Sequence, residues 1–271
     1  MCRLLGYLGP SLQLADLLLK PDHSLMVQSY QPKEMTSGVL NADGFGVGWY
    51  GHPSPSGQAD LDPPFPYVYR NTLPIWSDEN LEDLCRYVQS PCVLANVRSA
   101  TAGQPVQLSN CQPFRFGQIL AVHNGYIENF RQTLYRPLRD RLSDNCYQMI
   151  KGTTDSEHLF ALFCQHYLES PHLSLVDALR QTLELILKLA AAEGIKAGLN
   201  LILSDGNQLV ACRSAYPSQP PSLYWLEDDP TFARSKLIVS EPIFSSDHWR
   251  SFANDSVLVL GEDLEPQTYQ L

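Results

Sequence analysis

The stretch Gln118-Ile-Leu-Ala-Val-His-Asn-Gly-Tyr-Ile-Glu-Asn129 joins an apolar run to an Asn-Gly pair. The run Gln118–His123 has the length and the apolar, β-branched content of a buried strand. A helix is expected after the pair, because apolar residues recur with helical spacing over Ile127–Leu142. A strand that ends in Asn124-Gly125 can direct a side-chain amide and a backbone N–H at one point, as an oxyanion hole requires. The same dipeptide is also common in ordinary turns, so the stretch alone leaves two interpretations.

Strand-like and helix-like segments follow one another on both sides of this stretch. Apolar β-type runs predict strands at Cys2–Leu8, Gly44–Tyr50, Cys92–Val97, Leu199–Ser204, Gln208–Arg213, Ser222–Leu226, Leu237–Ser240 and Ser256–Leu260. Helical spacing predicts further helices at Leu12–Leu19 with Ser11 as N-cap, Glu79–Val88 with Asp78 as N-cap, Ser156–Tyr167 and Leu173–Ala192. Loops are expected at His52–Pro66 and Ser99–Pro113. Strands, then helices, then strands favour a single α+β domain over residues 2–271, with helices packed on largely antiparallel sheets.

The composition excludes several classes of protein. The chain has 271 residues, with 19 Lys+Arg against 29 Asp+Glu and a formal net charge of −10. This acidic balance argues against nucleic-acid binding, because phosphates would repel the protein. No apolar run approaches the ~18 residues of a membrane span, and Met1–Lys20 lacks the basic start of a signal peptide. We therefore expect a cytoplasmic protein without nucleic-acid or membrane partners, while homo-oligomer formation stays open.

Cysteine usage sets one residue apart. The chain has 7 cysteines, an odd number with no C-x-x-C pair, which argues against a disulfide framework or a zinc ribbon. Six are expected to be small buried apolar residues. Removal of Met1 would make Cys2 the N-terminal residue, with a nucleophilic thiol beside a free α-amine. That amine has a reference pKa of ~7.7–8.0 and can act as a general base. In the alternative, Cys2 only begins an edge strand.

Two further segments carry charges that suit an amino-acid ligand. Arg98 follows the run Cys92–Val97 and precedes a loop of small residues, so its guanidinium could clamp a carboxylate. The alternative for Arg98 is a surface salt bridge. Asp155 lies in Gly152–Glu157, before an amphipathic helix, where it could bind an ammonium group or cap the helix.

Neither a metal site nor a cofactor site is expected. The closest group of candidate ligands is His158, Cys164 and His166 on one predicted helix. At ~100° per residue these spacings do not bring all three side chains to one face. Core and surface positions are the better explanation for the histidines.

Five motifs in order resemble those of one family. They are Cys2-Arg-Leu-Leu-Gly6, Arg98-Ser-Ala-Thr-Ala-Gly103, Asn110-Cys-Gln-Pro-Phe114, His123-Asn-Gly125 with Glu128-Asn129, and Thr154-Asp-Ser-Glu157. Through them the chain resembles the class II glutamine amidotransferases, which have an N-terminal cysteine and belong to the N-terminal nucleophile (Ntn) hydrolases. The resemblance covers roughly residues 2–162. It implies a four-layer αββα sandwich of two mainly antiparallel sheets covered by helices.

The resemblance also implies a reaction and its residues. A γ-glutamyl amide would be cut through a thioester that water then hydrolyses, releasing glutamate. The implied catalytic residues are Cys2 as nucleophile, with its α-amine as base, and Asn124 and Gly125 as oxyanion hole. The implied substrate-binding residues are Arg98 for the α-carboxylate, Asp155 for the α-ammonium, and Thr101 and His123.

Three positions depart from the family pattern. Asn96 stands in place of a histidine, Ser99 in place of a bulky aromatic residue, and Arg3 in place of a glycine. These departures loosen the resemblance to synthases that channel ammonia. Together with Ser11–Leu17, Val27–Tyr30 and Asn41–Trp49, they resemble the γ-glutamyl amidohydrolases of ergothioneine biosynthesis. The implied reaction converts γ-glutamyl-hercynylcysteine S-oxide to hercynylcysteine S-oxide.

Other functions stay open at this point: a glutaminase subunit that supplies ammonia to a partner, a hydrolase of glutathione-type γ-glutamyl peptides, and a non-catalytic amino-acid-binding module. Because the motifs end near Leu162 and the rest of the chain is needed to finish the sheets, no separate ammonia-accepting domain fits, which favours a hydrolase. Leaving-group contacts are expected from Thr36–Asn41, Gln104–Asn110 and the C-terminal third. Trp76, Tyr224, Trp225 and Trp249 could hold a trimethylammonium by cation–π contact or pack in the core.

Overall fold

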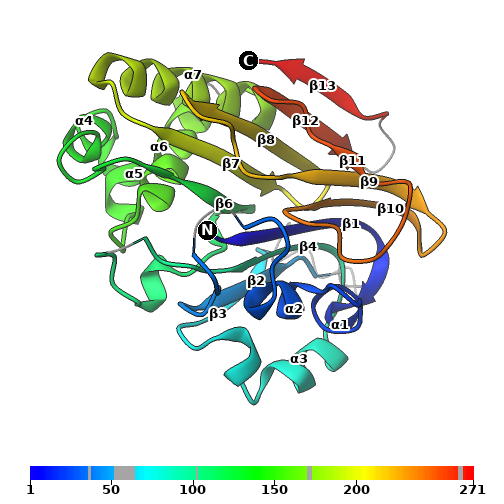
Figure 1. Cartoon of the computed structure of the whole chain (residues 1–271). Helices are drawn as coiled ribbons and strands as arrows, with labels where there is room; N and C mark the ends of the chain where they lie inside the picture. The colour runs from blue at the N-terminus through cyan, green and yellow to red at the C-terminus, as the bar shows by residue number, and fades with distance from the viewer. Residues whose placement is uncertain (36–37, 52–64, 102, 170–172, 262–264) are drawn as a thin grey trace, which may run out of the picture.

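Two antiparallel sheets stacked on each other form the centre of the molecule (Figure 1). The computed structural model describes the chain except residues 36–37, 52–64, 102, 170–172 and 262–264. The first sheet has the order β11-β9-β10-β1-β4-β2-β3, with β1 Arg3–Gln13, β2 Phe45–Trp49, β3 Tyr67–Asn71, β4 Gln89–Val97, β9 Tyr224–Asp229, β10 Phe232–Val239 and β11 Arg250–Ser251. The second has the order β13-β12-β8-β7-β6-β5, with β5 Phe114–Phe116, β6 Ile119–Ile127, β7 Ala197–Ser204, β8 Gln208–Tyr216, β12 Ser256–Gly261 and β13 Gln267–Gln270.

Helices cover the outer face of each sheet, which gives the expected four-layer αββα arrangement (Figure 1). The first sheet is covered by α1 Leu14–Leu18, α2 Leu25–Tyr30 and α3 Leu81–Tyr87. The second sheet is covered by α4 Tyr135–Arg139, α5 Asp144–Met149, α6 Asp155–Glu169 and α7 Leu175–Glu193. Each sheet receives strands from both the N-terminal and the C-terminal half of the chain, so neither half could complete a sheet alone.

The alternation of side chains along β1 explains the layers. Leu5 and Tyr7 pack in the core between the first sheet and its helices, whereas Leu4 and Leu8 pack in the core between the two sheets. Successive side chains of a strand point to opposite faces, so a strand buried on both sides reads as an almost continuous apolar run. Cys2 directly precedes this strand and is half-buried.

The quoted stretch forms a longer strand than expected. β6 continues through Asn124-Gly125 to Ile127, because it pairs with β7 from Leu120↔Ser204 up to Ile127↔Ala197. The Asn-Gly pair is therefore not a turn. The helix expected over Ile127–Leu142 was wrong at its start, since only Tyr135–Arg139 forms α4. Pairing with a strand far along the chain overrides the local helical spacing here.

Two predicted helix starts were also wrong. β1 extends to Gln13 and resumes its pairing with β4 after an irregularity between Leu8 and Leu12, so Ser11 lies in a strand and caps no helix. Asp78 accepts a hydrogen bond from the backbone of Asn80 at 2.9 Å and does not cap α3, which begins at Leu81. The Asp78 side chain thus stabilises the chain just before the helix.

Predictions based on strong local signals are confirmed. The Ser174 hydroxyl caps α7 by accepting from the backbone of Asp177 at 3.1 Å, and Gly194 ends that helix with a φ of 65°. β7 and β8 form the expected hairpin around Gly206. The six cysteines other than Cys2 are buried and all seven are free thiols. Most of the loop expected at His52–Pro66 lies outside the described residues.

Candidate active site

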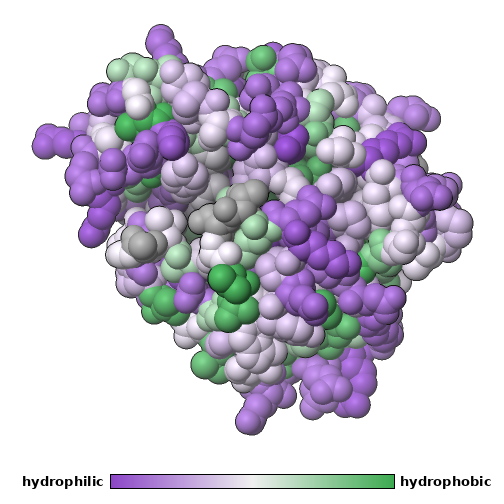
Figure 2. All heavy atoms as spheres, in the orientation of Figure 1, coloured by the Kyte–Doolittle hydropathy of each residue, from purple (hydrophilic) through white to green (hydrophobic). Residues whose placement is uncertain are grey.

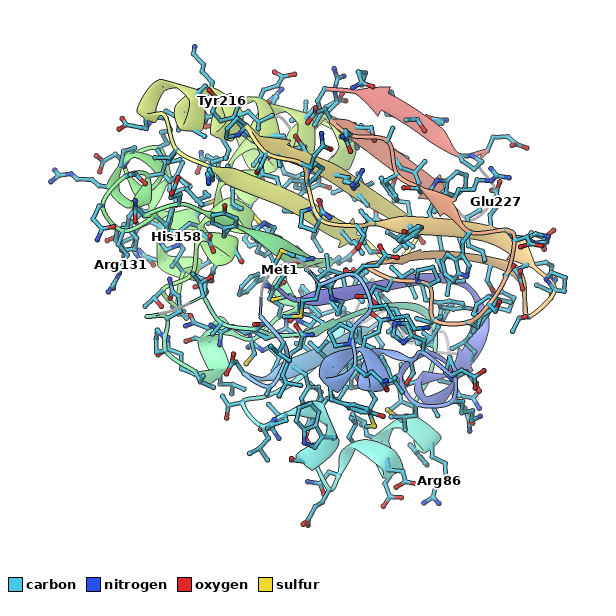
Figure 3. The ribbon with its side chains drawn as sticks, in the orientation of Figure 1. Met1, Arg86, Arg131, His158, Tyr216 and Glu227 are labelled. Atoms are coloured by element: carbon cyan, nitrogen blue, oxygen red, sulfur yellow. The ribbon has the colours of Figure 1, made fainter. Side chains whose placement is uncertain are left out.

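Cys2 lies where the two sheets approach each other at the start of β1. Figure 3 places Met1, its neighbour, near the middle of the molecule, far from the peripheral Arg86 and Arg131. The Cys2 thiol lies 3.8 Å from the backbone oxygen of Ser99. Two adjoining cavities meet at Cys2, a small one of about 30 Å³ and a larger one of about 680 Å³. The Cys2 thiol therefore lies between two cavities of very different size.

The small cavity contains most of the residues predicted from the sequence. Its lining is polar and consists of Cys2, Arg98, Ser99, Ala100, Thr101, Gln104, Asn110, Gln112, His123, Gly125, Thr154, Asp155 and Ser156. Arg98, Thr101, His123, Gly125 and Asp155 are thus brought together with Cys2, although up to 153 positions separate them in the chain. We call this cavity the polar pocket.

Arg98 is a buried cation in the lining of the polar pocket. It is only 4% exposed, and its guanidinium donates to the backbone oxygens of Asp43 at 3.2 Å and Pro105 at 3.4 Å. Within the described ranges no carboxylate forms an ion pair with it. A guanidinium has five N–H donors, so several stay available for an anion in the polar pocket. The alternative of a surface salt bridge is excluded.

Asp155 provides the opposite charge at the first residue of α6. One carboxylate oxygen accepts from the backbone of Ile127 at 2.7 Å, and the other accepts from the backbone of Ser156 at 2.8 Å. These two bonds tie the end of β6 to the start of α6. Each carboxylate oxygen has a second lone pair, so the group can still accept from an ammonium. Asp155 therefore stabilises the helix terminus and also lines the polar pocket, while its binding of a substrate ammonium stays a prediction.

His123 contributes to the pocket wall with both ring nitrogens engaged. Nδ1 lies 2.8 Å from the Ser156 hydroxyl, and Nε2 lies 3.1 Å from the backbone oxygen of Gly198. Because a carbonyl only accepts, Nε2 carries the proton and Nδ1 accepts from the hydroxyl. Burial lowers the pKa of His123, which keeps the ring neutral. This geometry favours a role in positioning Ser156 and β7, and direct substrate contact stays a prediction.

Asn124 and Gly125 occupy neighbouring positions with opposite orientations. Asn124 is fully buried, and its amide nitrogen and oxygen have no hydrogen-bond partner among the described residues. Gly125 lines the polar pocket, and a Cβ at this position would collide with the backbone oxygen of Gly198. Asn124 is not among the described lining residues of either cavity at Cys2. Its role with Gly125 as an oxyanion hole therefore stays a prediction.

Two residues at or near the polar pocket were not given roles by sequence reasoning. Asn110 lines the pocket, accepts from the backbone of Thr153 at 2.9 Å and donates to Pro105 at 3.1 Å. Asp43 accepts from the backbone of Ala100 at 2.8 Å, which fixes the loop after Arg98. Both residues stood in quoted stretches, Asn110–Phe114 and Asn41–Trp49, but their contacts depend on segments that only the fold brings together.

The larger cavity has a different chemistry. It is lined by Met1, Cys2, Gly38, Ser99, Ala100, Thr101, Gly125, Tyr126, Gly198, Ala215, Ser218, Gln219, Pro220 and Pro221. Its described lining contains no Asp, Glu, Lys or Arg. We call this cavity the neutral pocket. The aromatic residues expected at a leaving group do not line it: Tyr224 bonds Glu34 at 2.9 Å, and Arg250 lies 4.7 Å above the Trp225 ring.

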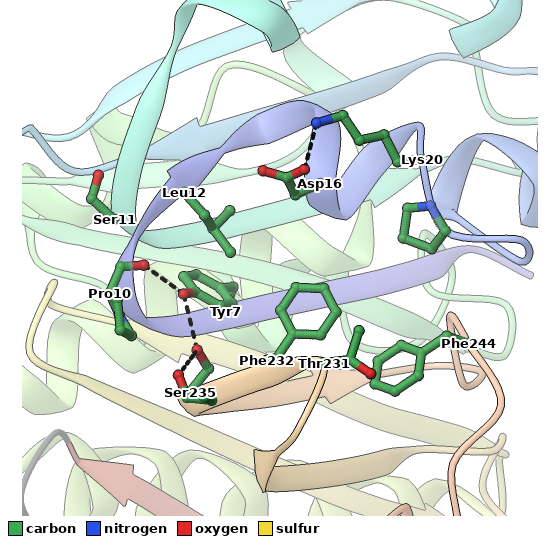
Figure 4. A pocket seen from close by; sticks show the side chains of 12 residues that line it. Tyr7, Pro10, Ser11, Leu12, Asp16, Lys20, Thr231, Phe232, Ser235 and Phe244 are labelled. Atoms are coloured by element: carbon green, nitrogen blue, oxygen red, sulfur yellow. Dashed lines mark hydrogen bonds and ion pairs between the residues drawn. The ribbon is translucent and has the colours of Figure 1, made fainter.

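Two other cavities lie away from Cys2. One, of about 460 Å³, is drawn in Figure 4, where Tyr7 bonds Pro10 and Ser235, and Lys20 pairs with Asp16. The other, of about 440 Å³, contains Arg70, Arg115 and Lys151 among its lining residues. Neither has a nucleophile with a nearby base. On the face drawn in Figure 2, hydrophobic residues form small separate groups within a hydrophilic surface.

Known proteins share this fold and its sequence pattern. A family model described as "Glutamine amidotransferases class-II" matches residues 1–259. The chain belongs to the class II glutamine amidotransferases. The gamma-glutamyl-hercynylcysteine sulfoxide hydrolase of Mycobacterium tuberculosis H37Rv is 34% identical to it over 211 residues, covering 78% of this chain and 76% of the relative. The hydrolase of the same name from Mycolicibacterium smegmatis is 39% identical over 128 residues, covering 47% of this chain and 52% of the relative.

Solved structures agree with this assignment to the class II amidotransferases. A glutamine aminotransferase class-II domain protein from Silicibacter pomeroyi has a TM-score of 0.69 at 26% identity and covers 99% of both chains. The glutamine phosphoribosylpyrophosphate amidotransferase of B. subtilis has a TM-score of 0.64 at 16% identity, and the match covers 49% of its chain. The second likeness concerns the fold alone.

Within the described part of the chain, no group of three or more His, Cys, Asp or Glu side chains could hold a metal ion. His158 instead bonds Thr154 and Arg139, and His166 bonds Thr182. Among the described helices, none is long and apolar enough to cross a membrane.

Proposed function

We propose that the protein hydrolyses the γ-glutamyl amide of γ-glutamyl-hercynylcysteine sulfoxide and releases glutamate. The observation that carries this proposal is the position of Cys2 between the polar pocket and the neutral pocket of about 680 Å³. A glutaminase expels only ammonia, whereas a cavity of several hundred Å³ suits a leaving group of drug size. The mycobacterial relatives carry the name of this hydrolase.

The polar pocket would hold the glutamyl half of the substrate. Its α-carboxylate would take a bidentate hydrogen bond from Arg98, and its α-ammonium would donate to Asp155. Thr101 would add a neutral contact to the same group. An α-amino acid carries both charges on one carbon, so a buried cation and anion in one pocket match it and reject substrates that lack either charge.

The reaction would require removal of Met1, which exposes the α-amine of Cys2. In the unprocessed chain the terminal amine belongs to Met1, and its pKa is lowered, chiefly by burial. With a reference pKa of ~7.7–8.0, part of a free Cys2 α-amine is unprotonated near neutral pH and can take the proton of the thiol. The thiolate attacks the γ-carbonyl carbon, and the oxyanion receives hydrogen bonds from the Asn124 amide and the Gly125 backbone N–H.

The tetrahedral intermediate would then collapse to a thioester. The C–N bond breaks, and the protonated α-amine of Cys2 gives its proton to the leaving nitrogen, which departs as an amine. A water molecule next attacks the thioester carbon, while the α-amine takes one of its protons. The C–S bond breaks, glutamate leaves, and the proton returns to the Cys2 sulfur. One water is consumed for each amide bond cleaved.

An assay of three substrates tests the proposal. Purified protein whose mass shows the loss of Met1 is incubated with L-glutamine, glutathione and γ-glutamyl-hercynylcysteine sulfoxide, and released glutamate is measured. The proposal expects the highest kcat/KM for the sulfoxide. A preference for glutamine would indicate a glutaminase subunit, and a preference for glutathione a γ-glutamyl peptide hydrolase. Binding of glutamate without any turnover would leave the amino-acid-binding module.

The proposal also covers the compartment, the partner and the oligomeric state of the protein. Free cysteines at every position fit a reducing compartment, which agrees with a cytoplasmic enzyme. The proposed partner is its small-molecule substrate, and residues 2–271 are proposed to act as one domain. Size-exclusion chromatography with light scattering would determine whether it forms a homo-oligomer.

A further inference from the structure

On the inner face of the second sheet, successive rows of paired residues change from apolar to polar and then to the lining of the neutral pocket. On β6, β7 and β8, residues that pair across the strands and point toward the first sheet form three successive rows. These are Val122–Ile202–Ala211, Asn124–Asn200–Arg213 and Tyr126–Gly198–Ala215. The first row belongs to the core between the sheets, the second is polar, and the third lines the neutral pocket. The rows therefore run from the core between the sheets, through the row that contains the proposed oxyanion residue Asn124, to the neutral pocket.

The last row forms a smooth floor for the neutral pocket. Gly198 has no side chain and Ala215 has only a methyl group, so the two leave room above the sheet. Tyr126 stands at the end of this row next to the proposed oxyanion donor Gly125, and its ring is the aromatic group in the described lining. A Cβ at Gly198 would lie 3.9 Å from Tyr126 Cδ1, so the ring borders the open space directly.

The middle row fixes the far wall of the same pocket. Arg213 donates from Nε to the backbone oxygen of Pro221 at 2.7 Å and from a terminal nitrogen to that of Pro220 at 3.1 Å. Asn200 donates to the same Pro221 oxygen at 3.1 Å and to Ser222 at 3.4 Å. A second terminal nitrogen of Arg213 donates to the backbone oxygen of Phe252 at 3.0 Å and to the side chain of Asn254. The guanidinium is therefore engaged by acceptors of the protein itself, and two of its hydrogen bonds position the Pro220-Pro221 segment of the pocket lining.

We propose that this floor and this wall bind the leaving group and determine which γ-glutamyl amides are cleaved. The inference rests on the proposed function and adds the residues that discriminate among substrates. Because the described lining carries no charged side chain, it recognises shape and neutral polar groups, and the Tyr126 face can contact a flat ring or a quaternary ammonium. The substrate class is a γ-glutamyl amide with a bulky ring-bearing amine. Arg213 and Asn200 are positioning residues for the wall.

The test compares two substrates in matched variants. Ala215→Phe fills the floor, whereas Ala253→Phe places the same ring at an exposed position before β12. The readout is selectivity, the kcat/KM for γ-glutamyl-hercynylcysteine sulfoxide divided by that for L-glutamine. The inference expects Ala215→Phe to lower this ratio by about tenfold or more. It expects Ala253→Phe to keep the wild-type ratio, with thermal unfolding measured for both.

A second pair of variants tests the wall without filling the cavity. Arg213→Met removes the guanidinium donors to the wall and leaves those of Asn200, and Arg213→Lys keeps a cation with one group of donors. The inference expects a raised KM for the sulfoxide in Arg213→Met and an intermediate KM in Arg213→Lys. An unchanged selectivity ratio in folded Ala215→Phe and Arg213→Met, with sulfoxide turnover intact in the wild type, would overturn the inference and leave the proposed function standing. A wild-type protein that cleaves neither substrate would overturn both.

Discussion

Cys2 is distinguished from the other six cysteines by its surroundings rather than by its residue type. Cys2 borders two cavities, whereas Cys85 is a fully buried residue of α3, and burial raises the pKa of Cys85 to about 12. A thiol with such a pKa is almost entirely protonated at neutral pH and is a poor nucleophile. The position of Cys2 in the fold therefore supports its proposed role as the nucleophile.

Replacing the proposed nucleophile separates binding from chemistry. We expect Cys2→Ala to abolish glutamate release, because no thioester can form, while glutamate still binds through Arg98 and Asp155. Cys85→Ala is the matched control and should keep turnover, since its thiol is buried away from both pockets. Glutamate release and calorimetric binding of glutamate measure the two effects. Residual turnover in Cys2→Ala would remove this residue from its proposed role.

Arg98 can be tested through the substrate as well as through the protein. Arg98→Met should lower kcat/KM for an α-amino acid substrate, because a buried charged partner is lost. The loss of transition-state stabilisation derived from kcat/KM should be about 2–3 kcal/mol. A substrate analogue without the α-carboxylate should be cleaved poorly by the wild type and no worse by the variant. Kinetics of both enzymes with both substrates form a double-mutant cycle. Equal losses with the two substrates would show that Arg98 only supports the loop at Asp43 and Pro105.

Among the elements, β6 shows where sequence-based prediction succeeds and where it stops. The five motifs placed Arg98, Asp155 and Gly125 in one site, because each carries its own local pattern of residue types. The helix expected from Ile127 failed at its start because Ile127 pairs with β7, some seventy positions later, and residues 128–134 form turns before α4. Likewise, the floor at Gly198 and Ala215 follows from strand register, which no single segment of sequence encodes.

Because β6 and β7 approach each other closely at Gly125, a single added methyl group there is expected to destabilise the fold. Gly125→Ala should destabilise the fold by about 2 kcal/mol or more, because its Cβ meets the backbone of Gly198, which cannot move without breaking the sheet. Gly51→Ala is the control, since a Cβ there has no neighbour within 4 Å. Thermal and urea unfolding of the two variants measure the difference. Equal stability of both would contradict the close approach seen between the strands.

The contact between α4 and α6 predicts a pH dependence of stability. His158 donates from Nδ1 to the backbone oxygen of Thr154 at 2.7 Å and accepts at Nε2 from Arg139 at 2.9 Å. Burial lowers the pKa of His158 to about 4, below its unfolded value near 6.5. The unfolded chain therefore binds a proton at pH 5 that the folded chain does not, so stability falls as pH drops below about 6.5.

The size of that loss can be measured with one variant. Between pH 7 and pH 5, His158 should account for about 2 kcal/mol of lost unfolding free energy. His158→Gln keeps an acceptor for Arg139 but cannot titrate, so the difference between its stabilities at the two pH values should be smaller by this amount. Urea unfolding at both pH values tests this, and an equal pH dependence in the two proteins would contradict the assigned protonation state.

At the scale of the whole molecule, the topology gives the two chain ends different environments. The N-terminus lies between the sheets, and the C-terminus follows β13 at the edge of the second sheet (Figure 1). Met1 lines the neutral pocket, so a residue retained before Cys2 would occupy the proposed leaving-group site and block the proposed α-amine base. The C-terminal residue Leu271 lines neither pocket. We therefore expect the proposed activity to depend on processing at the N-terminus and not on the C-terminus.

Tags at the two ends test this asymmetry. A protein with a protease-removable N-terminal tag should release no glutamate until cleavage leaves Cys2 first, because its amine cannot otherwise accept the thiol proton. The same tag at the C-terminus should leave kcat/KM unchanged. Intact mass measured beside glutamate release shows which terminus is present in each sample. Full activity in a preparation whose mass retains residues before Cys2 would exclude the α-amine as base and require another proton acceptor near the polar pocket.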